Sequence, residues 1–240
     1  MISLTKKYEL LTKLPLLQGL SGKELAHIES VIGMEVNEVP TMKRPLIRQN
    51  DPCTHLVFLT TGKLMRQYES DDGLYMTRTV IRAPALLEPY NLYGLDCRFR
   101  SSYTPLQEVS FITVKKRDVM QHLMKVDIFR INYFNMLSAI IHKKDTLLQP
   151  QCNHTVRQKI ENFLQRQFAD GEEQGEIAIK MTDLAEYIGE TRLNTSHALN
   201  QMEEAHMIEL RRSLIVIPDA RKFRIERPIE KAKYESVANK

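Results

Sequence analysis

No stretch of this sequence is hydrophobic for long enough to cross a lipid bilayer. The N-terminal segment, Met1–Leu10, also lacks the apolar core followed by a cleavage site that marks a secretory signal peptide. The sequence therefore gives no sign of membrane insertion or export, and we expect a cytoplasmic protein with no membrane partner.

Cysteine is scarce, with only Cys53, Cys97 and Cys152. An odd number of widely spaced cysteines argues against a disulfide framework and against a clustered iron–sulfur site, so we expect small apolar or surface cysteines. Cys152 lies close to His154, but two candidate ligands do not make a metal site. We predict no metal site, and the sequence leaves any cofactor unknown.

Motifs of common enzymes are missing as well. The sequence contains no G-x-S-x-G, no H-E-x-x-H and no P-loop, and no pair of carboxylates stands in a motif. We therefore predict no catalytic residues and a protein that is not an enzyme.

The composition is that of a soluble globular protein, with 42% hydrophobic and 27% charged residues among 240. The net charge of +4 is unevenly distributed. Residues 1–150 carry 20 basic and 15 acidic side chains, whereas residues 151–240 carry 14 basic and 15 acidic ones. A C-terminal part with net charge −1 has no general basic character, so any surface for nucleic acid there must come from local placement of charge.

Hydrophobic periodicity divides the chain into three parts. A helix is expected over residues 3–13, and a capping box at Ser21–Glu24 predicts a second helix over 22–32. Short alternating segments then suggest strands, until a helical period returns over 127–148 and Pro150 breaks it. We therefore predict an α+β protein with a β-roll or jelly-roll barrel domain and flanking helices at 1–126, a long dimerisation helix at 127–149, and a winged helix domain at 150–240.

The strands of the predicted barrel are short and separated by turns. We expect them at residues 55–60, 63–68, 74–81 and 107–114. Gly62 and the pair Asp72-Gly73 supply turn residues between the first three. Many short strands with frequent turns are typical of a small barrel or sandwich.

Residues 182–203 predict two short helices around a tight turn. Leu184, Ala185 and Ile188 form an apolar stripe, and Gly189 follows at the place where a helix-turn-helix needs a residue that tolerates positive φ. The second helix has a matching stripe of Thr195, Ala198, Leu199 and Met202. Its opposite face suits the DNA major groove, where arginine and amide side chains pair with base edges. That face carries Arg192, Leu193, Asn194, Ser196, His197, Asn200 and Gln201.

A β-hairpin is expected directly after these helices, with strands at 206–210 and 214–217. A helix-turn-helix followed by a hairpin is a winged helix. Arg211 and Arg212 lie at the tip of the wing, where they either contact phosphates or belong to an ordinary solvated turn.

The long helix at 127–148 has apolar residues at spacings that resemble a coiled-coil seam. They are Ile131, Phe134, Leu137, Ile141 and Leu148. The alternative is a helix packed against its own barrel. We favour a dimer helix, because a helix that reads one major groove is usually half of a symmetric pair.

This order of parts resembles the Crp/Fnr family of bacterial transcription regulators over nearly the whole chain. The resemblance is carried by Pro15–Ser21, the strand–Gly62–strand unit, Asp72-Gly73, Arg100–Ser102 and Leu184–Met202. It implies a homodimer bound to an inverted-repeat operator in double-stranded DNA, with RNA polymerase as a further partner. It also implies a roll like a cyclic nucleotide-binding domain, which in some members binds a small-molecule effector.

The resemblance is weaker at the effector site. Members that bind cyclic nucleotides have a Gly-Glu pair before an Arg-Ser segment, whereas here Pro89 and Tyr90 precede Arg100-Ser101. Pro89 lacks the backbone N–H and Tyr90 lacks the carboxylate, and Glu88 could substitute only after a local shift. We therefore do not expect cAMP. The candidate effector-binding residues are Glu88, Tyr90, Arg100 and Ser101.

Other branches of the family fit no better. The iron–sulfur branch needs clustered N-terminal cysteines, and none precedes Cys53. No histidine or cysteine stands out as a haem ligand.

The second helix also departs from the family's common Arg-Glu-x-x-x-Arg pattern, because Leu193 replaces the glutamate and His197 the second arginine. The operator should therefore differ from the usual one. The candidate DNA-binding residues are Arg192, Leu193, Asn194, Ser196, His197, Asn200, Arg211 and Arg212.

The sequence thus predicts a sequence-specific, homodimeric DNA-binding regulator of transcription. The alternative is a ligand-sensing module whose winged helix contacts another protein, which the net charge of −1 over 151–240 favours.

Overall fold

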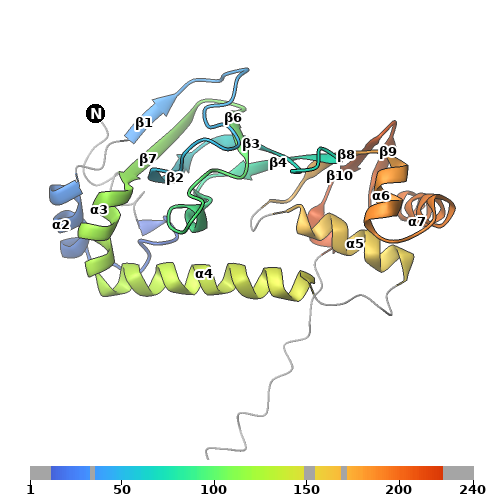
Figure 1. Ribbon diagram of the computed structural model, residues 1–240. Coiled ribbons are helices and arrows are strands. Elements are labelled where there is room, and N and C mark those ends of the chain that lie inside the picture. Colours follow the sequence, from blue (N-terminus) through green and yellow to red (C-terminus); the bar gives the residue numbers. More distant parts are fainter. Residues whose placement is uncertain (1–11, 33–35, 149–154, 169–171, 224–240) are drawn as a thin grey trace, which may run out of the picture.

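The computed structural model describes residues 12–32, 36–148, 155–168 and 172–223. Figure 1 shows a strand-rich roll with the long helix α4 along one side and a small helical part beyond its far end. Helices and antiparallel sheets occupy largely separate segments, so the predicted α+β class is confirmed. Most of the helix expected over 3–13 lies outside the described residues.

The roll is built from two antiparallel sheets. The four-stranded sheet has the order β1-β7-β2-β5, with bounds Val36–Val39, Val109–Lys115, His55–Thr61 and Ala85–Leu87. The other sheet begins with β6 (Ser102–Pro105), β3 (Lys63–Glu69) and β4 (Tyr75–Arg82). The four predicted strands correspond to β2, β3, β4 and β7, and the structure adds β1, β5 and β6.

Gly62 makes the turn between β2 and β3 as predicted. Its φ is +90°, and a Cβ at this position would stand 2.5 Å from the carbonyl oxygen of Glu108. Glycine is therefore required both by the backbone conformation and by the close approach of the neighbouring chain.

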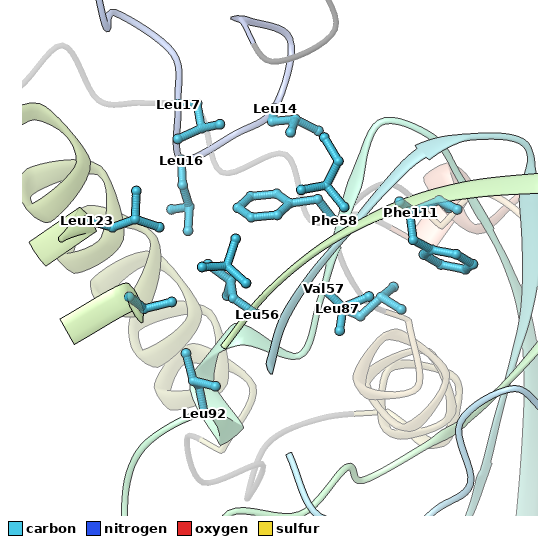
Figure 2. Packing of buried hydrophobic residues seen from close by; sticks show 14 of the residues in the cluster. Leu14, Leu16, Leu17, Leu56, Val57, Phe58, Leu87, Leu92, Phe111 and Leu123 are labelled. Atoms are coloured by element: carbon cyan, nitrogen blue, oxygen red, sulfur yellow. The ribbon is translucent and has the colours of Figure 1, made fainter. Parts of the chain in front are cut away.

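Strand β2 is buried on both of its faces. Figure 2 shows Leu56 and Phe58 on the side of Leu14 and Leu16, while Val57 points to the opposite side of the strand. All five of these side chains are buried. Alternate side chains of a strand point to opposite faces, so the nearly continuous apolar run of β2 fits a strand covered on both faces.

Helices cover the outer face of the four-stranded sheet (Figure 1). They are α2 (Gly22–Ile32), α3 (Lys116–Gln121) and α4 (Asp127–Leu148), with short 3₁₀ turns η1 (Pro89–Asn91) and η2 (Leu123–Lys125) beside them. The predicted capping box of α2 is present, because the Ser21 amide and hydroxyl donate to the Glu24 carboxylate at 2.8 and 2.7 Å.

Helix α4 presents two different apolar faces. Phe129 and Tyr133 are buried against the roll, and Leu137 packs there too. Ile131, Phe134 and Ile141 are exposed. Leu137 is partly buried against the roll and lies at the edge of the predicted seam, which stays a prediction, and the side chain of Leu148 lies outside the described residues.

The C-terminal part has a hydrophobic core of its own, separate from that of the roll. Its elements are α5 (Val156–Arg166), β8 (Gly175–Ile179), α6 (Met181–Tyr187), α7 (Arg192–Glu204), β9 (Glu209–Arg211), β10 (Leu214–Ile217) and η3 (Ala220–Phe223). None of the described helices is both long enough and apolar enough to span a membrane.

The two parts share one sheet, which the sequence did not predict. Strand β4 of the roll pairs with β8, so the second sheet continues in the order β6-β3-β4-β8-β10-β9. Beside this junction Arg66 of β3 forms an ion pair with Glu172 at 2.8 Å, and the Glu172 side chain is only 1% exposed. Tyr75 of β4 packs edge-on against Phe163 and Tyr187. The winged part is thus joined to the roll by backbone pairing, a buried charge pair and aromatic contacts.

Candidate functional site

The turn between α6 and α7 has the geometry that the sequence predicted. Gly189 has a φ of +67° and donates its amide to the Glu186 carbonyl at 3.1 Å. The Glu190 amide then donates to the Ala185 carbonyl at 2.9 Å, which closes the end of α6. A residue without a Cβ is favoured at this positive φ, so Gly189 allows α7 to leave α6 at once.

Two side chains fix the beginning of α7. The Thr191 hydroxyl caps the helix by accepting from the Asn194 amide at 3.2 Å. The neighbouring Glu190 accepts from the Lys159 ammonium of α5 at 2.6 Å. The hydrogen bond from Lys159, aided by its charge and by the Asn194 side chain, lowers the pKa of the Glu190 carboxyl. The turn is therefore anchored to α5 as well as to α6.

Helix α7 separates its residues into a buried and an exposed face, as predicted. Thr195, Ala198, Leu199 and Met202 are buried. On the other face Leu193 is 79% exposed, although it is large and apolar. Arg192, Asn194, His197, Asn200 and Gln201 are exposed beside it, and Ser196 is partly exposed. The predicted contact face is therefore free of the roll, and Figure 1 places α7 at the end of the molecule opposite α2 and α3.

Charge on α7 changes sign along the helix. Arg192 occupies the first position, and the acidic Glu203 and Glu204 end the helix. The partial positive charge of a helix N-terminus adds to that of Arg192. Arg192 and the helix N-terminus therefore bring positive charge to this end of α7, next to the Glu190–Lys159 ion pair, even though residues 151–240 are not basic overall.

The wing is a tight hairpin of β9 and β10, with Arg211 paired to Leu214. Arg212 and Ser213 make the turn, and Ser213 has a φ of +53°. Arg211 lies in β9 instead of the turn, and its guanidinium contacts the Glu209 carboxylate at 3.3 Å. Both arginines are exposed, and Arg212 stands nearer the tip.

The candidate effector residues are close in space but are engaged within the protein. The buried Glu88 carboxylate accepts from the Arg100 amide at 2.6 Å, from Asn91 at 2.7 Å and from the Tyr103 hydroxyl at 2.9 Å. Glu88 itself has a left-handed backbone with a φ of +40°. Its carboxylate therefore holds this loop together and is committed to internal donors.

The side chains of the other three candidate effector residues make separate contacts. The Arg100 guanidinium is half-exposed and contacts the Asp71 carboxylate at 3.3 Å. The Tyr90 ring lies 4.9 Å from the ammonium of Lys144 on α4, and burial raises the pKa of its hydroxyl. Ser101 is buried.

A cavity of about 330 Å³ opens in the roll. It is lined mainly by apolar side chains, including Val39, Val57 and Phe111, with His55 among the polar ones. None of the four candidate effector residues lines it. Periodicity could not reveal this cavity, because its lining residues come from segments far apart in the chain.

Among the residues that the structure describes, no three histidine, cysteine, aspartate or glutamate side chains lie close enough together to hold a metal ion. Cys152 and His154 lie outside the described residues.

The roles of Lys159, Glu190 and Thr191 were not predicted from the sequence. The Thr191 cap was detectable in principle, since threonine just before a predicted helix is a common N-cap signal.

Comparison with known proteins supports this description. Residues 158–224 match the family model described as the Crp-like helix-turn-helix domain. Comparison with curated protein sequences gave no match.

Among solved structures, the catabolite activator protein of Thermus thermophilus has 17% sequence identity and a TM-score of 0.51, with 87% of this chain and 96% of that chain aligned. DNR of Pseudomonas aeruginosa has 14% identity and a TM-score of 0.46, with 93% of this chain and 98% of that chain aligned. The segment that matches the family model, residues 158–224, contains β8 to β10 and both helices of the helix-turn-helix. The chain therefore carries a Crp-like helix-turn-helix domain at residues 158–224, and its overall fold is similar to that of the catabolite activator protein.

Proposed function

We propose that this protein is a homodimeric transcription regulator that inserts α7 into the major groove of double-stranded DNA. The observation that carries the proposal is the exposed, polar outer face of α7, presented at the free end of the molecule (Figure 1). Arg192 and the amide side chains on this face have the chemistry that reads base edges. Leu193 suits contact with a thymine methyl group, and Arg212 suits the phosphate backbone beside the groove.

The proposed dimer uses the exposed side of α4. Ile131, Phe134 and Ile141 form an apolar stripe on that side, while Phe129 and Tyr133 hold the helix to the roll. Such a stripe is unfavourable in water and suits a parallel contact with the same helix of a second copy. Two copies of α7 related by twofold symmetry would bind an inverted-repeat operator.

We propose the division into an effector-type roll at 1–126, a dimerisation helix at 127–149 and a DNA-binding domain at 150–240. The separate hydrophobic cores of the roll and the winged part support it. We further propose a cytoplasmic protein that works with RNA polymerase and has no enzymatic activity.

We propose that any small-molecule effector bound by the roll is a compound other than cAMP. Pro89 lacks the N–H that would donate to a phosphate, and the Glu88 carboxylate already accepts from Arg100, Asn91 and Tyr103. A ribose hydroxyl would have to displace one of these donors.

The test begins by selecting bound sequences from a random double-stranded DNA pool. Affinity for the selected operator is then measured for the wild type and for Arg192→Ala. We expect the substitution to weaken binding by about 1–3 kcal/mol without unfolding the protein, because Arg192 is exposed. Arg117→Ala is the matched control, since Arg117 is an equally exposed arginine on α3 of the roll, and it should leave affinity unchanged.

Salt dependence separates DNA binding from the competing function. Neutralisation of phosphates makes affinity fall steeply with salt concentration. If no DNA sequence is enriched and no salt-dependent binding appears, the winged helix does not bind DNA and the protein-binding alternative takes its place.

A further inference from the structure

Two cysteines from distant parts of the sequence meet in the roll. The Cys53 amide donates to the Cys97 carbonyl at 2.8 Å, and the adjacent Pro52 and Arg98 form an antiparallel bridge. Continuing this register by one residue sets Cys53 directly opposite Cys97. Opposed residues of an antiparallel pair project from the same face, and at a hydrogen-bonded position such as this one their Cα atoms lie about 5.5 Å apart. A disulfide spans Cα separations of about 4.4–6.8 Å, so the backbone spacing is compatible with a bond between the two sulfurs.

The two thiols have unlike surroundings. Cys53 is buried, and burial together with the negative charge of Glu88 raises its pKa to about 11. Cys97 is partly exposed, and the Lys116 ammonium donates to its sulfur at 3.3 Å. The Cys97 sulfur is thus partly open to solvent and held by a hydrogen bond, whereas Cys53 lies inside the core. Cys97 is therefore the thiol suited to meet an oxidant first, and Cys53 is its buried neighbour.

We propose that Cys97 and Cys53 are a thiol pair that a peroxide oxidises to a disulfide, with Lys116 as the positioning residue for the Cys97 thiolate. The Cys97 sulfur attacks one peroxide oxygen, the O–O bond breaks, and the departing hydroxide takes up a proton to give water. The resulting Cys97 sulfenic acid is attacked by the Cys53 sulfur after that thiol has lost its proton. The S–O bond breaks, a second water leaves, and two electrons have passed from the thiols to the peroxide.

The bond would tie the segment that leads into β2 to the loop after η1. That loop lies between Glu88 and Arg100, whose amide donates to the Glu88 carboxylate. Lys116 also contacts the loop, because its ammonium lies 5.1 Å from the centre of the Tyr93 ring. The proposed oxidation involves only residues of the roll, so its test is independent of whether the protein binds DNA.

Hydrogen peroxide acting on the full-length chain tests the proposal. After alkylation of the remaining thiols and proteolysis, mass spectrometry should find a Cys53–Cys97 linked peptide in the wild type and in the control Cys152→Ser. Cys97→Ser should lose the link. Cys53→Ser should stop at a sulfenic acid on Cys97, which dimedone traps. Failure to find the link in the wild type, or a link through Cys152 only, would overturn the proposal whatever the variants do.

The role of Lys116 has its own readout. In the Cys53→Ser background, where the sulfenic acid accumulates, Lys116→Met should slow dimedone labelling of Cys97 roughly threefold or more, because the sulfur loses the hydrogen bond from the ammonium. Lys116→Arg should keep most of the rate, since it keeps the charge. Equal rates in all three proteins would remove Lys116 from the proposal and leave the thiol pair to be judged on the linked peptide.

Discussion

Thr191 and Glu190 together determine where α7 begins. The Thr191 hydroxyl accepts the Asn194 amide, and the Glu190 carboxylate binds Lys159 on α5. An N-cap hydroxyl satisfies a helical N–H that would otherwise have no partner within the helix. The exposed face of α7 is thus positioned by two side chains that need not touch DNA themselves.

Thr191→Ala should therefore destabilise the winged part by about 1 kcal/mol, because the Asn194 amide loses its acceptor. The free energy of unfolding in urea, followed by circular dichroism, measures this. Thr191→Ser keeps the hydroxyl and is the control, which should stay within about 0.5 kcal/mol of the wild type. Equal loss in both variants would show that the cap contributes nothing.

Glu190 predicts a dependence of stability on pH. Its folded-state pKa is lowered below the ordinary 4.5, so its stabilisation is present above pH 4.5 and is lost as pH falls through the lowered pKa. Glu190→Gln should melt below the wild type at pH 7, and the two melting temperatures should converge in acid. In a Lys159→Met background the pH dependence of this difference should shrink, because only the hydrogen bond from the Asn194 side chain then lowers the Glu190 pKa. An undiminished difference there would contradict the assignment to Lys159.

At the scale of elements, periodicity predicted those segments whose own side chains set their structure. The capping box and apolar spacing gave α2, and the alternating runs gave β2 to β4 and β7. Strands β5 and β6 were missed because Ala85–Leu87 is only three residues long between Pro84 and Pro89, and Ser102–Pro105 is short and half polar. These two become strands through pairing with β2 and β3, which no local pattern reveals.

The partial burial of Leu137 has a geometric cause. It follows Phe134 by three residues and precedes Ile141 by four, a spacing that also fits the exposed stripe. On a straight helix of 3.6 residues per turn, however, Leu137 lies between the exposed stripe and the buried face that includes Tyr133. Its side chain packs against the roll. Spacing alone cannot tell which of two adjacent faces a boundary residue joins.

Helix α4 leads to a prediction about assembly. Phe134 is 56% exposed, so Phe134→Glu should leave the fold intact while placing repelling charges in the proposed seam. Sedimentation velocity should show a dimer for the wild type and a monomer for this variant. Met120→Glu alters an equally exposed residue on α3 and should remain dimeric. A monomeric wild type at every concentration would rule out the seam.

For the molecule as a whole, sequence patterns predicted the order of the parts along the chain but not how the winged part docks on the roll. Arg66 lies in an amphipathic strand and Glu172 in a polar loop, so both read as ordinary surface charges. In the structure they meet at 2.8 Å beside the β4–β8 junction. Contacts between residues so far apart in sequence depend on the finished fold, and sequence patterns carry little information about them.

Arg66→Met should accordingly be costly, because it leaves the buried Glu172 carboxylate without this cation. We expect a loss of about 3–5 kcal/mol in the free energy of unfolding, as is usual when one partner of a buried pair is removed. Arg157–Glu161 on α5 is an exposed pair at the same 2.8 Å distance. Arg157→Met should cost no more than about 1 kcal/mol, and similar losses in both variants would contradict the importance of burial.

The shared sheet constrains how α7 can move relative to the roll. Strand β8 pairs with β4 from Tyr75↔Ile179 to Thr79↔Gly175, and α6 starts two residues after β8 ends. The helix-turn-helix therefore cannot rotate as a freely jointed body. Any reorientation of α7 relative to the roll must either break the β4–β8 pairing or bend β3 and β4 with it. In the proposed dimer, the distance between the two copies of α7 would therefore follow the bending of these sheets.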